Sequence, residues 1–156
     1  MNNSQVFQKN HTKACSLMEK RKYAKAVPYL LTALEAVPNH PVVLSNLATS
    51  YYEAGALDEA ARTVSQAEFL GIKTAELNNV AGLIELKRQQ YTKALELFYE
   101  AVRKEPRISV YHNHLGVALF KLKKYPHAYN EFKTAVSLDP SNKEARRNLD
   151  DCEEFI

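Results

Sequence analysis

The side chains with the clearest chemical potential in this sequence are a histidine and a cysteine near the N-terminus. His11 and Cys15 stand four residues apart, a spacing that places both on one face of a helix. A thiolate beside an imidazolium is a nucleophile, and the same two side chains can bind a metal ion. Neither chemistry is complete with two groups, because no third orienting residue and no further ligands accompany them. We therefore expect no catalytic residue and no metal site here.

The other patterns that would indicate an enzyme are also missing from the sequence. It contains no glycine-rich phosphate loop and no His-Glu-x-x-His motif. His112 and His114 flank an asparagine, so on a helix they would point to different faces. The sequence predicts a protein that is not an enzyme and that carries no cofactor.

The elements that must position these residues repeat every 34 residues. Small residues recur in three series, which are Ala26, Ala60, Ala94 and Ala128; Ala33, Ala67, Ala101 and Ala135; and Ala14, Ala48, Gly82 and Gly116. A large apolar residue recurs at Leu30, Val64, Phe98 and Phe132. Independent series with one period indicate a repeat array, in which each unit buries its apolar face against its neighbours.

Each repeat unit has the pattern of two helices. Apolar residues follow the i, i+3, i+4, i+7 spacing of an amphipathic helix twice per unit. Pro38, Pro106 and Pro140 stand where second helices should end, and Gly55 suits a turn between helices. The period divides the chain into units 7–40, 41–74, 75–108 and 109–142, followed by a helical tail, 143–156.

The chain resembles the tetratricopeptide repeat (TPR) family in the stretches LSNLATSYYEAGALDEAARTVSQAEFLG, LNNVAGLIELKRQQYTKALELFYEAVRKEP and YHNHLGVALFKLKKYPHAYNEFKTAVSLDP. The first repeat, 7–40, departs from the family pattern, because Lys13 and Leu17 stand where the family usually has a Leu and a Tyr. The resemblance covers nearly the whole chain. It implies one all-α domain, 1–156: a right-handed superhelical α-solenoid of four helix-turn-helix units with a C-terminal capping helix.

The resemblance also implies a binding site. In this family the first helices of successive units line a concave groove that holds a peptide or helix of a partner protein. The side chains expected in that lining are Asn46, Thr49, Tyr52, Asn79, Val80, Leu83, Leu86, Asn113, His114, Val117 and Phe120. The lining is polar in the second repeat and becomes apolar in the third and fourth repeats. This trend favours a binding surface in the later repeats. The alternative is that helix 143–154 folds back and covers the apolar part with Leu149 and Phe155.

Three asparagines in this lining have a possible role of their own. The amides of Asn46, Asn79 and Asn113 can each donate and accept a hydrogen bond, so they could pair with the backbone of a bound peptide. The alternative is that asparagine is simply tolerated on an exposed helix surface.

Charge and composition narrow the class of partner and the compartment. The net charge is +3, and the basic clusters Lys20 to Lys22 and Lys121 to Lys124 fall at expected turns, so we expect solvated turns and no nucleic-acid partner. No apolar run is long enough to span a membrane. The N-terminus lacks the apolar block of a signal peptide, and Cys15 and Cys152 should be distant free thiols. These features favour the cytoplasm.

Three functions agree with these observations. The leading hypothesis is a non-catalytic adaptor that binds a peptide or helix of a partner in its groove. The alternatives are a small cytosolic chaperone for a secreted or assembly-prone substrate, and a self-assembling oligomeric scaffold. The polar tail DDCEEF resembles a solvating cap, which favours a monomer.

One partner class can be tested at once. Chaperone-binding TPR domains hold a C-terminal carboxylate with lysine, arginine and asparagine side chains of their first helices. Here Asn46 matches, but His11, Cys15, Glu76 and Val80 occupy the flanking positions. A fixed carboxylate needs charge-assisted donors, so we expect only weak binding when a chaperone C-terminal peptide is titrated into the protein. An affinity in the low-micromolar range would contradict this prediction.

Overall fold

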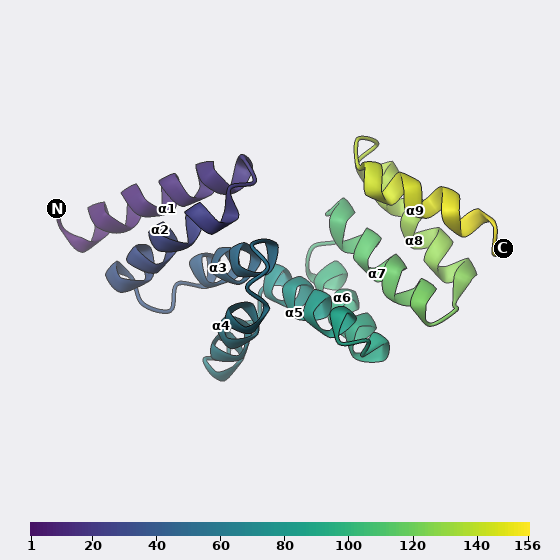
Figure 1. Cartoon of the computed structure of the whole chain (residues 1–156), viewed down its shortest axis with the longest axis horizontal. Helices are drawn as coiled ribbons and strands as arrows, with labels where there is room; N and C mark the ends of the chain where they lie inside the picture. The colour runs from purple at the N-terminus through teal and green to yellow at the C-terminus, as the bar shows by residue number, and fades with distance from the viewer. The chain divides into compact units, whose positions relative to one another are not determined.

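The structure is a computed structural model that describes residues 1–156 and is built from nine helices joined by turns (Figure 1). They are α1 (Asn3–Glu19), α2 (Tyr23–Ala36), α3 (Pro41–Glu53), α4 (Leu57–Phe69), α5 (Ala75–Lys87), α6 (Tyr91–Lys104), α7 (Ser109–Lys121), α8 (Tyr125–Leu138) and α9 (Lys143–Glu153). None of them combines the length and the apolar character that crossing a bilayer requires. The all-α fold of paired helices predicted from the sequence is confirmed.

The helix boundaries follow the 34-residue period. Helices α3, α5 and α7 begin at Pro41, Ala75 and Ser109, which are the first residues of the units 41–74, 75–108 and 109–142. Helices α2, α6 and α8 each end two residues before a proline, at 38, 106 or 140. Proline follows a helix end because it lacks the N–H that the next helical hydrogen bond needs. The predicted ends of these second helices are confirmed.

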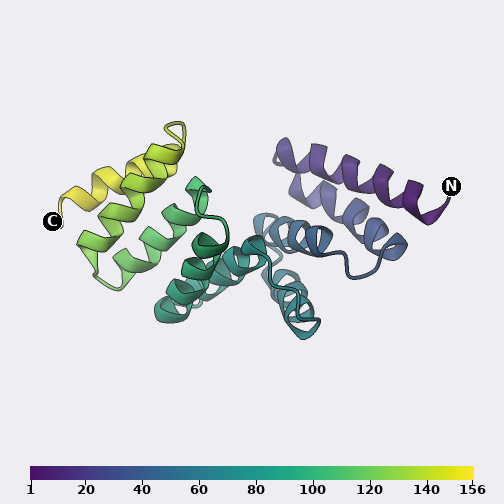
Figure 2. The same ribbon diagram turned by 180° about the vertical axis from the view of Figure 1, so that it is seen from behind.

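Contacts within the chain define two compact units, Met1–Val80 and Ala81–Ile156, with the boundary inside α5. The first unit contains α1 to α4 and the start of α5, and the second contains the end of α5 and α6 to α9. Figures 1 and 2 show the same motif in both: α1 lies along α2, and α7 lies along α8, as two helices joined by a tight turn.

The four turns inside the helix pairs have one backbone conformation. A residue with positive φ recurs every 34 residues, at Arg21 (55°), Gly55 (81°), Gln89 (61°) and Lys123 (58°). The N–H that follows reaches back to the last turn of the first helix, for example from Lys22 to the carbonyl of Leu17 at 2.8 Å. This is the hydrogen bond of a Schellman helix end. Only one of the four positions is glycine, so residue type indicated the positive φ at Gly55 alone.

Close approach of the two helices in each pair depends on matched small and large residues. A Cβ atom on Gly116 would lie 2.5 Å from Cε1 of Phe132, and one on Gly82 would lie 2.5 Å from Cε1 of Phe98. Both phenylalanines are almost fully buried, so neither ring can swing away. At the equivalent place in the first pair, Ala14 shares a buried cluster with the smaller Leu30. Glycine is therefore required where the opposite residue is phenylalanine.

Helix α9 closes the second unit by packing on both α7 and α8 (Figures 1 and 2). Its side chain at Cys152 joins the core cluster that contains Phe132. The side chain of Asn142 caps its N-terminus by accepting a hydrogen bond from the N–H of Ala145, and its amide donates to Oγ of Ser109 at 2.9 Å. Cys15 and Cys152 are both free thiols.

A buried histidine connects α7 to two neighbouring segments. Nδ1 of His112 lies 2.7 Å from a carboxylate oxygen of Glu131 on α8, and Nε2 lies 2.8 Å from the carbonyl oxygen of Pro106. A carboxylate and a carbonyl can only accept, so the ring must donate from both nitrogens and is an imidazolium. The hydrogen bond to Glu131 accordingly raises the pKa of His112, and burial only partly opposes it.

The glycine–phenylalanine pairing predicts the effect of one added methyl group. Alanine in place of Gly116 gains about 1 kcal/mol of helix propensity, but overpacking a rigid core costs about 1–3 kcal/mol. Because the ring of Phe132 is confined, we expect the clash to dominate and urea denaturation to show a net loss of stability. In the Gly116→Ala background, Phe132→Leu should cost less than it does in the wild type. Equal costs in the two backgrounds would contradict the pairing.

The imidazolium predicts a pH dependence of stability with a definite sign. A pKa raised by folding gives stability that is complete below the unfolded value of about 6.5 and is lost as the pH rises through the folded pKa. We therefore expect His112→Gln to lower the free energy of unfolding more at about pH 6 than at about pH 9. The exposed His127→Gln variant is the control. A His112→Gln effect that grows with pH would rule out the charged pair.

Candidate functional site

The first part of the expected binding surface lies on α3 and is a set of half-buried polar side chains. Oγ1 of Thr49 donates a hydrogen bond to the carboxylate of Glu76 on α5. Nδ2 of Asn46 lies 3.9 Å from Sγ of Cys15 on α1, and Tyr52 is half-buried nearby on α3. The structure therefore brings Asn46 and Thr49 into contacts between successive first helices. Their hydrogen-bonding groups are partly used inside the unit.

His11 and Cys15 do come together on α1, as their spacing predicted. Sγ of Cys15 lies 3.5 Å from Nε2 of His11, and the ring of Phe7 stacks on His11 with its centroid 5.4 Å away. Burial raises the pKa of the Cys15 thiol, and burial together with nearby His40 lowers the pKa of His11. Both shifts favour the neutral forms, so the pair is a thiol beside an imidazole and not a thiolate nucleophile. No group of three or more possible metal ligands is present in the structure.

Three residues expected in the open groove are instead buried. Asn79, Val80 and Asn113 expose only 5%, 1% and 2% of their surface. The amide of Asn113 is held by α9: Nδ2 donates to Glu144 at 3.2 Å, and Oδ1 accepts from Asn148 at 2.8 Å. The expectation that these side chains face a bound peptide is corrected for this reason, and we omit all three from the proposed surface.

His114 of α7 is half-buried in the second unit. Its ring centroid lies 5.5 Å from that of Phe98, the phenylalanine that packs against Gly82. Removal from water lowers the pKa of His114 to about 4, so the ring is neutral at neutral pH. It stabilises the α6–α7 contact and does not present a charge to a partner.

The apolar part of the expected surface is half-buried and lies in the second unit. Leu83, Leu86, Val117 and Phe120 all pack against the core cluster around Phe132 while keeping part of their surface exposed. Leu149 of α9 packs on the same cluster.

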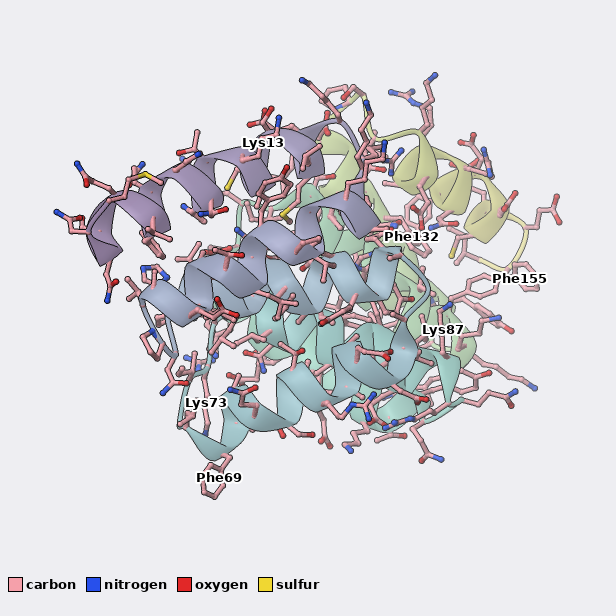
Figure 3. All side chains as sticks on the ribbon, turned by 60° about the vertical axis from the view of Figure 1, so that its left-hand side comes forward. Lys13, Phe69, Lys73, Lys87, Phe132 and Phe155 are labelled. Carbon is pink, nitrogen blue, oxygen red and sulfur yellow. The ribbon has the colours of Figure 1, made fainter.

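The C-terminal end of this apolar surface is covered by the chain itself. Phe155, which follows α9 (Figure 3), meets Phe120 edge to face at 5.1 Å and stacks on Tyr125 at 4.8 Å. Of the four apolar residues, Phe120 is thus the one that Phe155 contacts.

One feature of the second unit was not identified from the sequence. A groove of about 540 Å³ runs between α6 and α8, with α7 as its floor. The sequence feature that could have indicated this groove is the pair Leu95 and Tyr99, which stand four residues apart and so lie on one face of α6. The binding surface that the family resemblance implies lies on the first helices, so it gave no indication of a site on the second helix α6.

The comparisons with known proteins agree with this fold. Two tetratricopeptide repeat models match residues 17–69 and 109–142. The BBSome complex member BBS4 homolog of Drosophila melanogaster is 25% identical over 130 residues, which cover 83% of this chain and 27% of the relative. This chain thus spans little more than a quarter of the length of that protein.

Two solved structures have a similar fold of paired helices. Pseudomonas aeruginosa PilF matches with a TM-score of 0.79 and 18% identity, over 97% of this chain and 69% of that one. YrrB, described as a TPR protein with an unusual peptide-binding site, matches with a TM-score of 0.68 and 17% identity, over 99% of this chain and 84% of that one. These structures share the fold of the chain. The two matching repeat models, which together cover more than half of its residues, show that the chain belongs to the tetratricopeptide repeat family.

Proposed function

We propose that this protein is a non-catalytic scaffold that binds a peptide or helix of a partner protein along the first helices of its second unit. TPR proteins mediate protein–protein interactions. The observation that carries the proposal is the row of partly exposed apolar side chains, Leu83, Leu86 and Val117, on α5 and α7. Apolar residues that stay accessible on a helix surface are typical of a partner-binding face.

The free energy gained by burying this row of apolar side chains is too small to account for tight binding by itself. Complete burial of a leucine or valine side chain contributes about 1.5–3 kcal/mol, so a side chain that is already half-buried can add roughly 1 kcal/mol. Three such side chains fall short of the about 8 kcal/mol of a micromolar complex. The partner must therefore add hydrogen bonds or charges of its own to the contacts with this row.

The similar proteins support this proposal without identifying a partner. YrrB is described as having a peptide-binding site, and the Drosophila relative is a member of a multiprotein complex. We infer for this chain the same general role, as a binding component and not as a catalyst. The neutral state of the His11–Cys15 pair supports this inference.

Two further properties follow as proposals. Free Cys15 and Cys152 are compatible with a reducing compartment such as the cytoplasm. The outward side of α9 carries charged residues, among them Lys143, Arg147 and Asp150, so end-to-end stacking on α9 would bury charges. This charged face favours a monomer at the C-terminal end.

Photo-crosslinking tests the proposed surface directly. With a photoreactive amino acid in place of Leu86 or Val117, we expect ultraviolet light to join the same partner protein from the source lysate to both positions. The partner would be identified by mass spectrometry. The matched control is the same amino acid in place of Leu31, which is 41% exposed on the second helix α2. Circular dichroism would establish that each variant is folded.

The outcome distinguishes this face from any other. A partner joined from positions 86 and 117 but not from position 31 supports binding along the first helices. A partner joined equally from all three positions, or from position 31 alone, would show that recognition uses another surface.

A further inference from the structure

The groove between α6 and α8 has the size and composition of a binding site, and it lies within one unit. Its volume of about 540 Å³ falls in the range of about 300–1,000 Å³ found for ligand sites. Leu95 of α6 and Leu115 and Leu119 of α7 form an apolar part of its lining. It is bounded by the second helices α6 and α8, so it is separate from the row on the first helices.

Three of the residues that line the groove are acidic and none is lysine or arginine, while His127 and Asn130 of α8 complete its polar lining. Glu96 and Glu100 line it from α6, and Glu131 lines it from α8. Two of these carboxylates are engaged within the chain: Glu100 binds Arg103 at 2.8 Å, and Glu131 binds His112 at 2.7 Å. Glu96 is exposed and makes no ion pair or side-chain hydrogen bond. It is the carboxylate available to an incoming cation.

An exposed aromatic ring lies beside this carboxylate. Tyr99 exposes 59% of its surface, and its spacing from Glu96 and Glu100 places all three on one face of α6. A guanidinium over the face of a tyrosine gains a cation–π interaction. In the same position it would lie next to Glu96, which adds a charge-assisted hydrogen bond. The neighbouring leucines can then take up an apolar side chain of the same ligand.

We propose that this groove binds a segment of a partner protein that carries an arginine or lysine next to a large apolar side chain. The cation contacts Glu96 and Tyr99. The apolar side chain packs against half-buried Leu95, over a floor formed by Leu115 and Leu119, which expose only 4% and 9% of their surface. This function goes beyond the proposed binding along the first helices and uses different residues.

A second copy of the chain is the competing occupant of this groove. Arg107 and Ile108 are both exposed, and Ile108 exposes 41% of its surface, so this pair carries a cation next to a large apolar side chain. Dimerisation is therefore one of the outcomes that the test distinguishes.

A phage-displayed peptide library supplies the probe for the test. Selection is made on the whole protein, and bound peptides are then compared on two variants. The groove variant is Glu96→Lys with Tyr99→Ala. The control is Glu68→Lys with Phe69→Ala on α4, which makes the same changes of charge and aromatic content at exposed positions, since Phe69 is 91% exposed and projects into solvent (Figure 3). All substituted residues are exposed, and circular dichroism would establish that both variants fold.

We expect a set of peptides that bind the wild type and the control but lose at least about tenfold in affinity for the groove variant, a change of about 1.4 kcal/mol. These peptides should carry arginine or lysine within one helical turn of a large apolar residue, and salt should weaken their binding. A groove-dependent set without cations, or no groove-dependent set, would overturn the proposal. So would groove-dependent dimerisation of the protein in sedimentation experiments.

A further variant separates this proposal from the proposed function. Leu86→Glu alters the row on the first helices and leaves the lining of the groove unchanged. Groove-dependent peptides should bind this variant as they bind the wild type. If they lose affinity for it as strongly as for the groove variant, they bind on the first helices and the groove proposal fails.

Discussion

The structure depends on the close approach of two helices at one crossing point in every repeat. In the second unit, the approach requires a glycine, because Phe132 leaves no room for a Cβ atom on Gly116. In the first pair, a smaller leucine lies opposite an alanine. In both cases a small residue on one helix accommodates a large one on the other, although the residue types differ. This constraint fixes the register of the pair, and the register decides which residues of each helix face outward.

The features predicted correctly from the sequence are those that recur with the period. A residue type repeated every 34 positions reports a shared environment, so the small crossing residues and the prolines gave the helix pairs and their ends. The turn conformation recurs as faithfully, yet Arg21, Gln89 and Lys123 adopt positive φ without being glycine. The short turn imposes that conformation, and the Schellman hydrogen bond compensates for it, so residue type alone does not report it.

The binding surface was harder to predict because burial depends on contacts between elements and not on the repeat. Asn113 occupies the repeat position of Asn79, and a repeat pattern cannot show that α9 holds its amide through Asn148. The charge state of a side chain also depends on contacts that the repeat pattern does not reveal. His112 reads from the sequence as one more histidine, and only its two acceptors identify it as an imidazolium. The sequence pattern predicted that the apolar residues of α5 and α7 lie on the surface, but it did not predict that they are half-buried.

The fold also decides which carboxylates remain available for binding. Glu131 lines the groove, but its negative charge is paired with His112, and this pair connects α7 to α8. Glu100 is likewise held by Arg103 one turn away. A partner cation that approached either one would compete with an existing interaction and gain little. Glu96 has no such competitor, and Tyr99 stands one turn from it on the same face. In the complex that we propose, selectivity for a positively charged partner therefore depends on α6, whose inward face packs in the core through Phe98 while its outward face carries Glu96 and Tyr99.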